Sequence, residues 1–96
     1  MVEKIIWTKK SLADLKVIYD YINTNSHHYA KLTIQQIIAK AELIKNSAFA
    51  GRIVPEFNNP SLREFFHKDF RIIYRISTNI IYIVRVYHAS RLLRKL

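Results

Sequence analysis

The arginines of this chain are confined to its second half. None precedes residue 51, and all seven follow it, at Arg52, Arg63, Arg71, Arg75, Arg85, Arg91 and Arg94. Arginine keeps its charge at any physiological pH, and its planar fork matches the geometry of phosphate oxygens. The stretch from Gly51 to His88 also contains both prolines and the single glycine. Function is therefore expected in this half, with the first half as its support.

The arginine-rich half belongs to one folded domain, residues 1–96. Half of the residues are hydrophobic and 12% are aromatic, which is enough for a core and unlike a disordered chain. Lys and Arg number 16 against 7 acidic residues, so the formal net charge is +9. This balance favours phosphate polymers, anionic membrane surfaces or acidic proteins as partners.

The absence of cysteine excludes disulfides and thiolate metal sites, and a reducing cytoplasm is the simplest location. No apolar run is long enough for a signal peptide or a membrane span, so no membrane association is expected.

Hydrophobic periodicity predicts an α+β fold in the order β-α-α-β-β-β. A helical hairpin should pack on a twisted, mainly antiparallel sheet of four strands. Ser11, with Asp14 three residues later, resembles a capping box for the first helix, and Ser26 can cap the second. Residues 48–59 read as irregular, and residues 89–96 as a short helix or coil. The strands are expected at 2–7, 62–67, 70–76 and 80–87, and the helices at 12–22 and from 27 to about 46.

The last two strands form a hairpin whose register decides which side chains meet. A two-residue turn at Thr78 and Asn79 places Arg71 opposite Val86. His88 then lies diagonal to Arg71, roughly 7–8 Å away between Cα atoms, on the same open face of the sheet. The other, more apolar face should cover the helices.

A turn of a different length would reverse this arrangement. A slip of one residue flips every side chain of a strand to the other face, and would put Arg85 and Tyr87 beside Arg71. In the preferred register Arg85 instead falls on the apolar face, where an acidic residue near the sheet end would have to pair with it.

Four segments in this order resemble the RelE/ParE superfamily of toxins from type II toxin–antitoxin systems, over nearly the whole chain. They are Gly51-Arg52-x-Val54-Pro55-Glu56, Arg63-Glu64, Phe70-Arg71-Ile72-Ile73-Tyr74 and Val84-Arg85-Val86-x-His88-x-x-Arg91. The resemblance implies a cytoplasmic toxin that is neutralised by an acidic antitoxin, and a toxin–antitoxin heterotetramer is one assembly to expect.

One branch of the superfamily, similar to RelE and YoeB, cleaves messenger RNA on the ribosome. The positions that match its working residues are Glu56, Arg71 and His88. Their chemistry suits RNA cleavage without a metal or other cofactor: Glu56 as base for the 2′-hydroxyl, Arg71 as phosphate clamp and His88 as acid. The implied RNA contacts are Arg52, Arg63, Lys68, Arg75, Arg85, Tyr87 and Arg91.

A metal-independent, ribosome-associated mRNA endoribonuclease is therefore the function that we predict, and two alternatives stay open. The ParE branch is thought to poison DNA gyrase and lacks that catalytic set, and the segment around His88 looks as much like ParE as like YoeB. A degenerate, non-toxic relative is the third reading. Each candidate residue also has an ordinary structural role: Glu56 can pair with Arg52 or Arg63, Arg71 can be a solvated or antitoxin-binding charge, and His88 can cap a strand end.

Overall fold

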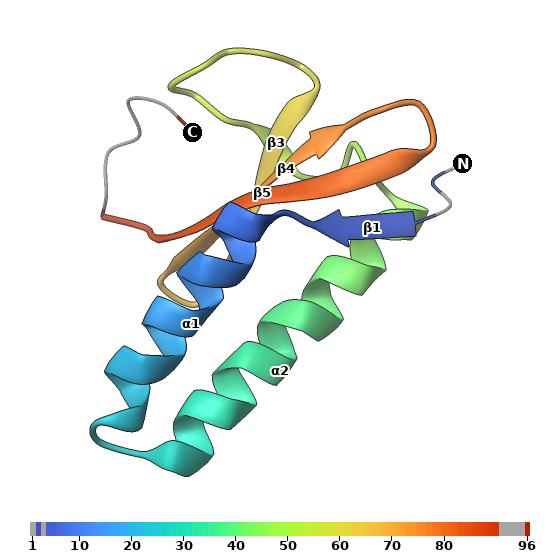
Figure 1. The fold of residues 1–96 in the computed structure, drawn as a ribbon. Coiled ribbons are helices and arrows are strands. Elements are labelled where there is room, and N and C mark those ends of the chain that lie inside the picture. The colour runs from blue at the N-terminus through green and yellow to red at the C-terminus, as the bar shows by residue number, and fades with distance from the viewer. Residues whose placement is uncertain (1, 3, 91–95) are drawn as a thin grey trace.

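The structure, a computed structural model, describes residues 2, 4–90 and 96. Its helices are α1 (Lys9–Asn23), α2 (His27–Leu43) and the short 3₁₀ helix η1 (Ile44–Asn46). Its strands are β1 (Lys4–Trp7), β2 (Arg52–Ile53), β3 (Leu62–His67), β4 (Phe70–Ile76) and β5 (Ile80–His88). The two long helices form an antiparallel hairpin against one face of the sheet (Figure 1), which confirms the predicted α+β fold.

The sheet has five strands in the order β1-β5-β4-β3-β2, one more than predicted. β1 runs parallel to β5, and the other neighbours are antiparallel. The additional strand is β2, in which Arg52 pairs with Glu64 and Ile53 with Arg63. Two residues carry too little alternation to be recognised as a strand, so this part of the irregular segment was predicted wrongly.

The first helix begins earlier than its sequence pattern indicates. Thr8, not Ser11, is the N-cap: its Oγ1 accepts a hydrogen bond from the backbone N–H of Ser11 at 3.2 Å. Thr8 Oγ1 also donates to the Ile83 carbonyl at 2.9 Å, so the helix start is tied to β5. Ser11 itself is buried and donates to the Thr8 carbonyl. The predicted cap at Ser26 is confirmed, because its side chain accepts from Tyr29 N–H.

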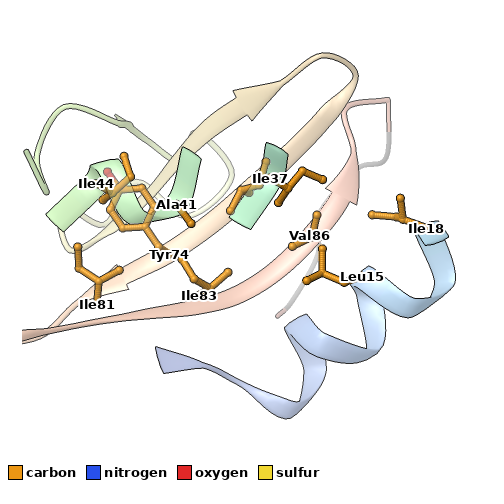
Figure 2. Packing of buried hydrophobic residues seen from close by; sticks show 10 residues of the cluster. Leu15, Ile18, Ile37, Ala41, Ile44, Tyr74, Ile81, Ile83 and Val86 are labelled. Atoms are coloured by element: carbon orange, nitrogen blue, oxygen red, sulfur yellow. The ribbon is translucent and has the colours of Figure 1, made fainter. Parts of the chain in front are cut away.

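The main core lies between the helical hairpin and the sheet. Tyr74, Ile81 and Ile83 point from the sheet toward α2, and Val86 toward α1 (Figure 2). The helices pack against these side chains with buried apolar residues at helical spacing: Leu15, Ile18, Ile37, Ala41 and Ile44.

A second, smaller core covers the opposite face of the sheet. It joins Val54, Leu62, Ile73, Val84 and Tyr87. The loop between β2 and β3 lies on this side, away from the helices (Figure 1). This face is therefore partly covered and not the open basic surface that was predicted.

The β4–β5 hairpin contains a β-bulge that changes which residues share a face. The turn is as predicted, since Ser77 N–H donates to the Ile80 carbonyl at 2.8 Å. The pairing then shifts by one residue at Ile73/Tyr74, so Arg71 faces Tyr87, not Val86. The extra residue on β5 sends His88 and Val86 to the helical side. The prediction that Arg71 and His88 share a face is wrong for this reason.

In residues 89–96, which were predicted as a short helix or coil, Ala89 and Ser90 form a turn, and residues 91–95 lie outside the described residues.

Among the helices that the structure describes, none combines the length and apolar character needed to cross a membrane.

Candidate functional site

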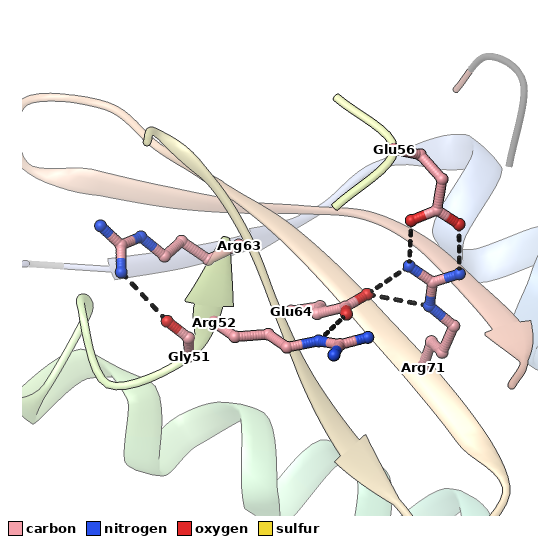
Figure 3. Close-up of polar contacts among 6 residues, drawn as sticks. All are labelled: Gly51, Arg52, Glu56, Arg63, Glu64 and Arg71. Atoms are coloured by element: carbon pink, nitrogen blue, oxygen red, sulfur yellow. Dashed lines mark hydrogen bonds and ion pairs between the residues drawn. The ribbon is translucent and has the colours of Figure 1, made fainter. Parts of the chain in front are cut away.

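Arg71 lies at the centre of a network of four charged side chains on the face of the sheet that carries the second core (Figure 3). Its Nη1 and Nη2 donate to the two carboxylate oxygens of Glu56 at 2.8 and 2.9 Å. Its Nε and Nη2 donate to Glu64 Oε1 at 2.8 and 2.6 Å. The other oxygen of Glu64 accepts from Arg52 Nε. Every nitrogen of the Arg71 guanidinium thus donates to a carboxylate.

Two local features bring these side chains together. A tight turn at Lys68 and Asp69, with Lys68 at a φ of 52°, sets the β3–β4 register so that Arg71 faces Phe66. Glu64 then lies one diagonal step from Arg71 on the same face. Glu56 comes from a turn after β2, in which the Val54 carbonyl accepts from the N–H groups of Phe57 and Asn58.

The network is electrically balanced, and its centre is shielded from water while Arg52 and Glu56 reach the surface. Two arginines meet two glutamates, and the side chains of Arg71 and Glu64 are 5% and 0% exposed. The Glu56 carboxylate, followed by Glu64, raises the pKa of Arg71 above its usual value, although burial opposes the shift. A guanidinium held in this way binds the β2–β3 loop to the sheet.

His88 lies apart from this network, on the helical side of the sheet. It pairs with Phe70 across β4 and β5, and the two rings are in edge-to-face contact with their centroids 5.9 Å apart. Its Nδ1 is 2.8 Å from Ser90 Oγ and accepts from Ser90 N–H. It lines a largely apolar hollow of about 450 Å³ with Val17 and Tyr21 of α1. The structure therefore places Glu56 beside Arg71, whereas His88 lies on the opposite side of the sheet from both.

Three of the predicted RNA contacts hold the protein's own backbone or side chains. Arg63 donates to the carbonyls of Pro60, Phe49 and Gly51 and so fixes the loop before β2. Arg52 bonds Glu64 and stacks on the Phe66 ring at 5.2 Å. Lys68 Nζ bonds the Tyr29 hydroxyl at 3.0 Å.

The remaining predicted contacts differ in exposure. Arg75 is exposed, and Tyr87 is buried in the second core. Arg91 lies outside the described residues. Arg85 pairs with an acid, since its Nε and Nη2 donate to Asp14 at 2.8 and 2.9 Å. Its predicted place on the helical face is wrong, because the bulge sets it opposite Ile73 on the second-core face.

The Arg85–Asp14 pair joins α1 to the last strand. Asp14 also accepts from Val86 N–H at 2.9 Å, where β1 no longer covers the edge of β5. Hydrogen bonding to Asp14 raises the pKa of Arg85. The contact secures the bulged end of β5 against the helix.

The part of the chain that the structure describes contains no group of three His, Asp or Glu residues placed to hold a metal ion.

Comparison with known families gives this arrangement a context. The family described as "ParE toxin of type II toxin-antitoxin system, parDE" matches residues 5–93. This chain belongs to that family. As a ParE-family protein it is a toxin of a type II toxin–antitoxin system, and membership implies an antitoxin partner.

Individual relatives agree with the family assignment. The chain is 30% identical to "Toxin RelE2" of Caulobacter vibrioides over 90 residues, which are 93% of this chain and 98% of that protein. Its fold is similar to a structure titled "Chromosomal ParDE TA system from P. aeruginosa", with a TM-score of 0.76, 26% identity and coverage of 94% and 98% of the two chains. The "YoeB/ParE toxin from Agrobacterium tumefaciens" has a TM-score of 0.64 at 16% identity, covering 90% and 98%, and supports the fold alone.

Glu64 is the member of the network that sequence reasoning did not single out in this ParE-family chain. A glutamate between Leu62 and Phe66, both on one face of β3, was the available signal. A two-residue turn at Lys68 and Asp69 would have placed that carboxylate beside Arg71. Because a buried carboxylate requires a partner, the pattern predicts an ion pair.

Proposed function

We propose that this ParE-family toxin arrests growth by inhibiting DNA gyrase and does not cleave RNA. The observation that carries the proposal is the position of His88. It lies on the helical side of the sheet, whereas Arg71 and Glu56 meet on the other side. An acid and a base that serve one scissile phosphate must both come within hydrogen-bonding reach of it.

The state of Arg71 supports the same proposal. A catalytic cation stabilises a pentavalent phosphate by directing donors at the charge that develops there. Here the nitrogens of Arg71 donate to Glu56 and Glu64, and its side chain is 5% exposed. Phosphate binding at Arg71 would require a carboxylate to leave the guanidinium, either Glu56 in its exposed loop or the buried Glu64.

The likeness to the ParDE system of P. aeruginosa is consistent with a ParE-type target. The formal charge of +9 gives the toxin a surface suited to an acidic antitoxin, which we expect to neutralise it. We expect the toxin to work in the cytoplasm and to need no metal.

A supercoiling assay tests the proposal directly. Purified toxin added to DNA gyrase, ATP and relaxed plasmid should reduce the yield of supercoiled plasmid, and purified antitoxin should restore it. In cells, induction should raise an SOS reporter while primer extension finds intact transcripts. Codon-dependent breaks in translated mRNA, with gyrase activity unchanged, would overturn the proposal in favour of an endoribonuclease.

His88→Ala provides a control that does not depend on the charge network. His88 is exposed, its hydrogen bonds are to Ser90, and its ring contacts Phe70 at the sheet end, so the variant should remain folded. A gyrase inhibitor should keep its toxicity, whereas a nuclease that uses His88 as its acid should lose it. If His88→Ala abolished arrest at an unchanged melting temperature, the acid role would be restored to this residue.

A further inference from the structure

Tyr29 and Lys68 meet where the start of α2 lies against the turn between β3 and β4. Lys68 Nζ donates a hydrogen bond to the Tyr29 hydroxyl at 3.0 Å, and the same ammonium lies 4.8 Å from the centre of the Tyr29 ring. Both residues are exposed, Tyr29 to 42%. The hydroxyl is therefore accessible to a reagent while a cation stands beside it.

The position of Tyr29 in the helix favours negative charge as well. α2 begins after Ser26, whose side chain accepts from Tyr29 N–H, so Tyr29 is the third residue of the helix. The first turn of α2 contains no acidic residue, and the positive end of the helix dipole favours an anion there. Long side chains of a helix lean toward its N-terminus, which brings the Tyr29 oxygen toward that end. Lys68 and the helix end thus both favour the phenolate.

The acidity of Tyr29 agrees with this geometry. The hydrogen bond from Lys68, followed by its charge, lowers the pKa of Tyr29 below its usual value, although desolvation and Asp69 oppose the shift. Tyr74 is the opposite case, because burial raises its pKa and its hydroxyl donates to the Ala48 carbonyl. A larger fraction of the ionised form makes a side chain a better nucleophile at neutral pH.

We propose that Tyr29 is a covalent modification site that accepts a phosphoryl group from an activated phosphate donor. The phenolate oxygen forms a bond to phosphorus, and the bond from phosphorus to the leaving group breaks. The leaving group takes the electron pair, and the phenol proton passes to solvent. A phosphoryl group carries a charge of about −1.5 to −2 at neutral pH, which suits a position beside a lysine and at a helix N-terminus. The inference does not depend on how the toxin stops growth.

Diisopropyl fluorophosphate is a small probe of this reactivity, since attack by Tyr29 forms the oxygen–phosphorus bond and releases fluoride. The folded toxin is treated at neutral pH, and peptide mass spectrometry gives the rate at each tyrosine. Tyr29 should react about two- to fivefold faster than Tyr21, a difference expected for one exposed ionic contact. Tyr21 is 77% exposed, and no cation lies over its ring within the described part of the chain. Exposure alone would make Tyr21 the faster of the two.

Three variants separate the effect of charge from that of structure. Lys68→Gln should slow the reaction of Tyr29 about two- to fivefold, and Lys68→Arg should keep the rate of the wild type. Lys9→Gln removes an exposed lysine at the other end of the helical hairpin and should leave the rate unchanged. The rate at Tyr21 should be the same in all three variants. The proposal fails if Tyr21 reacts as fast as Tyr29, if Lys9→Gln slows Tyr29 as much as Lys68→Gln does, or if Lys68→Arg is as slow as Lys68→Gln.

Discussion

Nη2 of Arg71 lies 2.6 Å from Oε1 of Glu64, and both side chains are almost completely buried. Glu56 caps the same guanidinium from the loop above the sheet (Figure 3). Arg71 therefore joins three elements of the fold: β3, β4 and the loop between β2 and β3. A substitution at this position changes the stability of the toxin before it changes any chemistry.

Arg71→Ala should destabilise the protein strongly. The substitution leaves the Glu64 carboxylate buried with only Arg52 as its partner, and breaking a buried pair costs about 3–5 kcal/mol. That is a large part of the stability of a small domain. Urea denaturation followed by circular dichroism measures the loss.

Arg75→Ala is the matched control for Arg71→Ala. It removes an exposed arginine of the same strand, and its free energy of unfolding should change by less than about 0.5 kcal/mol. Equal stability of both variants would show that Arg71 is not held as described. Loss of toxicity in Arg71→Ala is informative about catalysis only if the variant remains folded.

Asp14→Asn and Asp20→Asn should differ, although both remove an acid from α1. Asp14 pairs with part-buried Arg85 and bonds Val86 N–H, so its loss should cost about 1–3 kcal/mol. Asp20 pairs with Lys16 in an exposed i,i+4 contact, worth at most about 1 kcal/mol. Thermal denaturation of the two variants at equal ionic strength compares them. Similar melting temperatures would argue against the role of Asp14 in holding β5.

The parts of this fold that could be predicted from the sequence are those set by interactions between neighbouring residues. The cap at Ser26 and the turn at Thr78 and Asn79 involve neighbouring residues, and both were predicted. The bulge on β5 was not, because Val84 and Arg85 carry no glycine or other turn signal. This one extra residue on β5, for which the sequence carries no signal, places His88 on the helical side of the sheet.

The site was harder to predict than the fold. The arginine at position 71 was recognised as important, but its surroundings depend on Glu64, which precedes it by seven residues in the chain, and on Glu56 in an irregular loop. Sequence spacing indicates which groups can carry charge. It does not show whether a charge faces solvent or another charge, which is decided by register and burial.

Gly51→Ala should destabilise the protein because Gly51 packs closely against Glu64 of β3 and Tyr74 of β4. A Cβ at this position would lie 2.7 Å from the Glu64 carbonyl oxygen and would collide with the Tyr74 hydroxyl. That hydroxyl accepts from Gly51 N–H and donates to the Ala48 carbonyl, so it cannot move freely. We expect a loss of about 1–3 kcal/mol. The exposed neighbour Ala50 provides the control, since Ala50→Ser should leave the denaturation midpoint unchanged.

His67 should make stability depend on pH. Burial, followed by Lys40 and Lys68, lowers the pKa of His67 from its usual value. The unfolded chain, with a histidine pKa near 6.5, therefore binds the proton more readily than the folded chain. The free energy of unfolding should fall as the pH drops below about 6.5, and the contribution of His67 should be complete above it.

Urea denaturation at a series of pH values, compared between wild type and His67→Asn, isolates this contribution. His28→Asn changes an exposed histidine of α2 and serves as the control. An unchanged pH slope in His67→Asn would show that the surroundings of His67 in the folded chain do not lower its pKa.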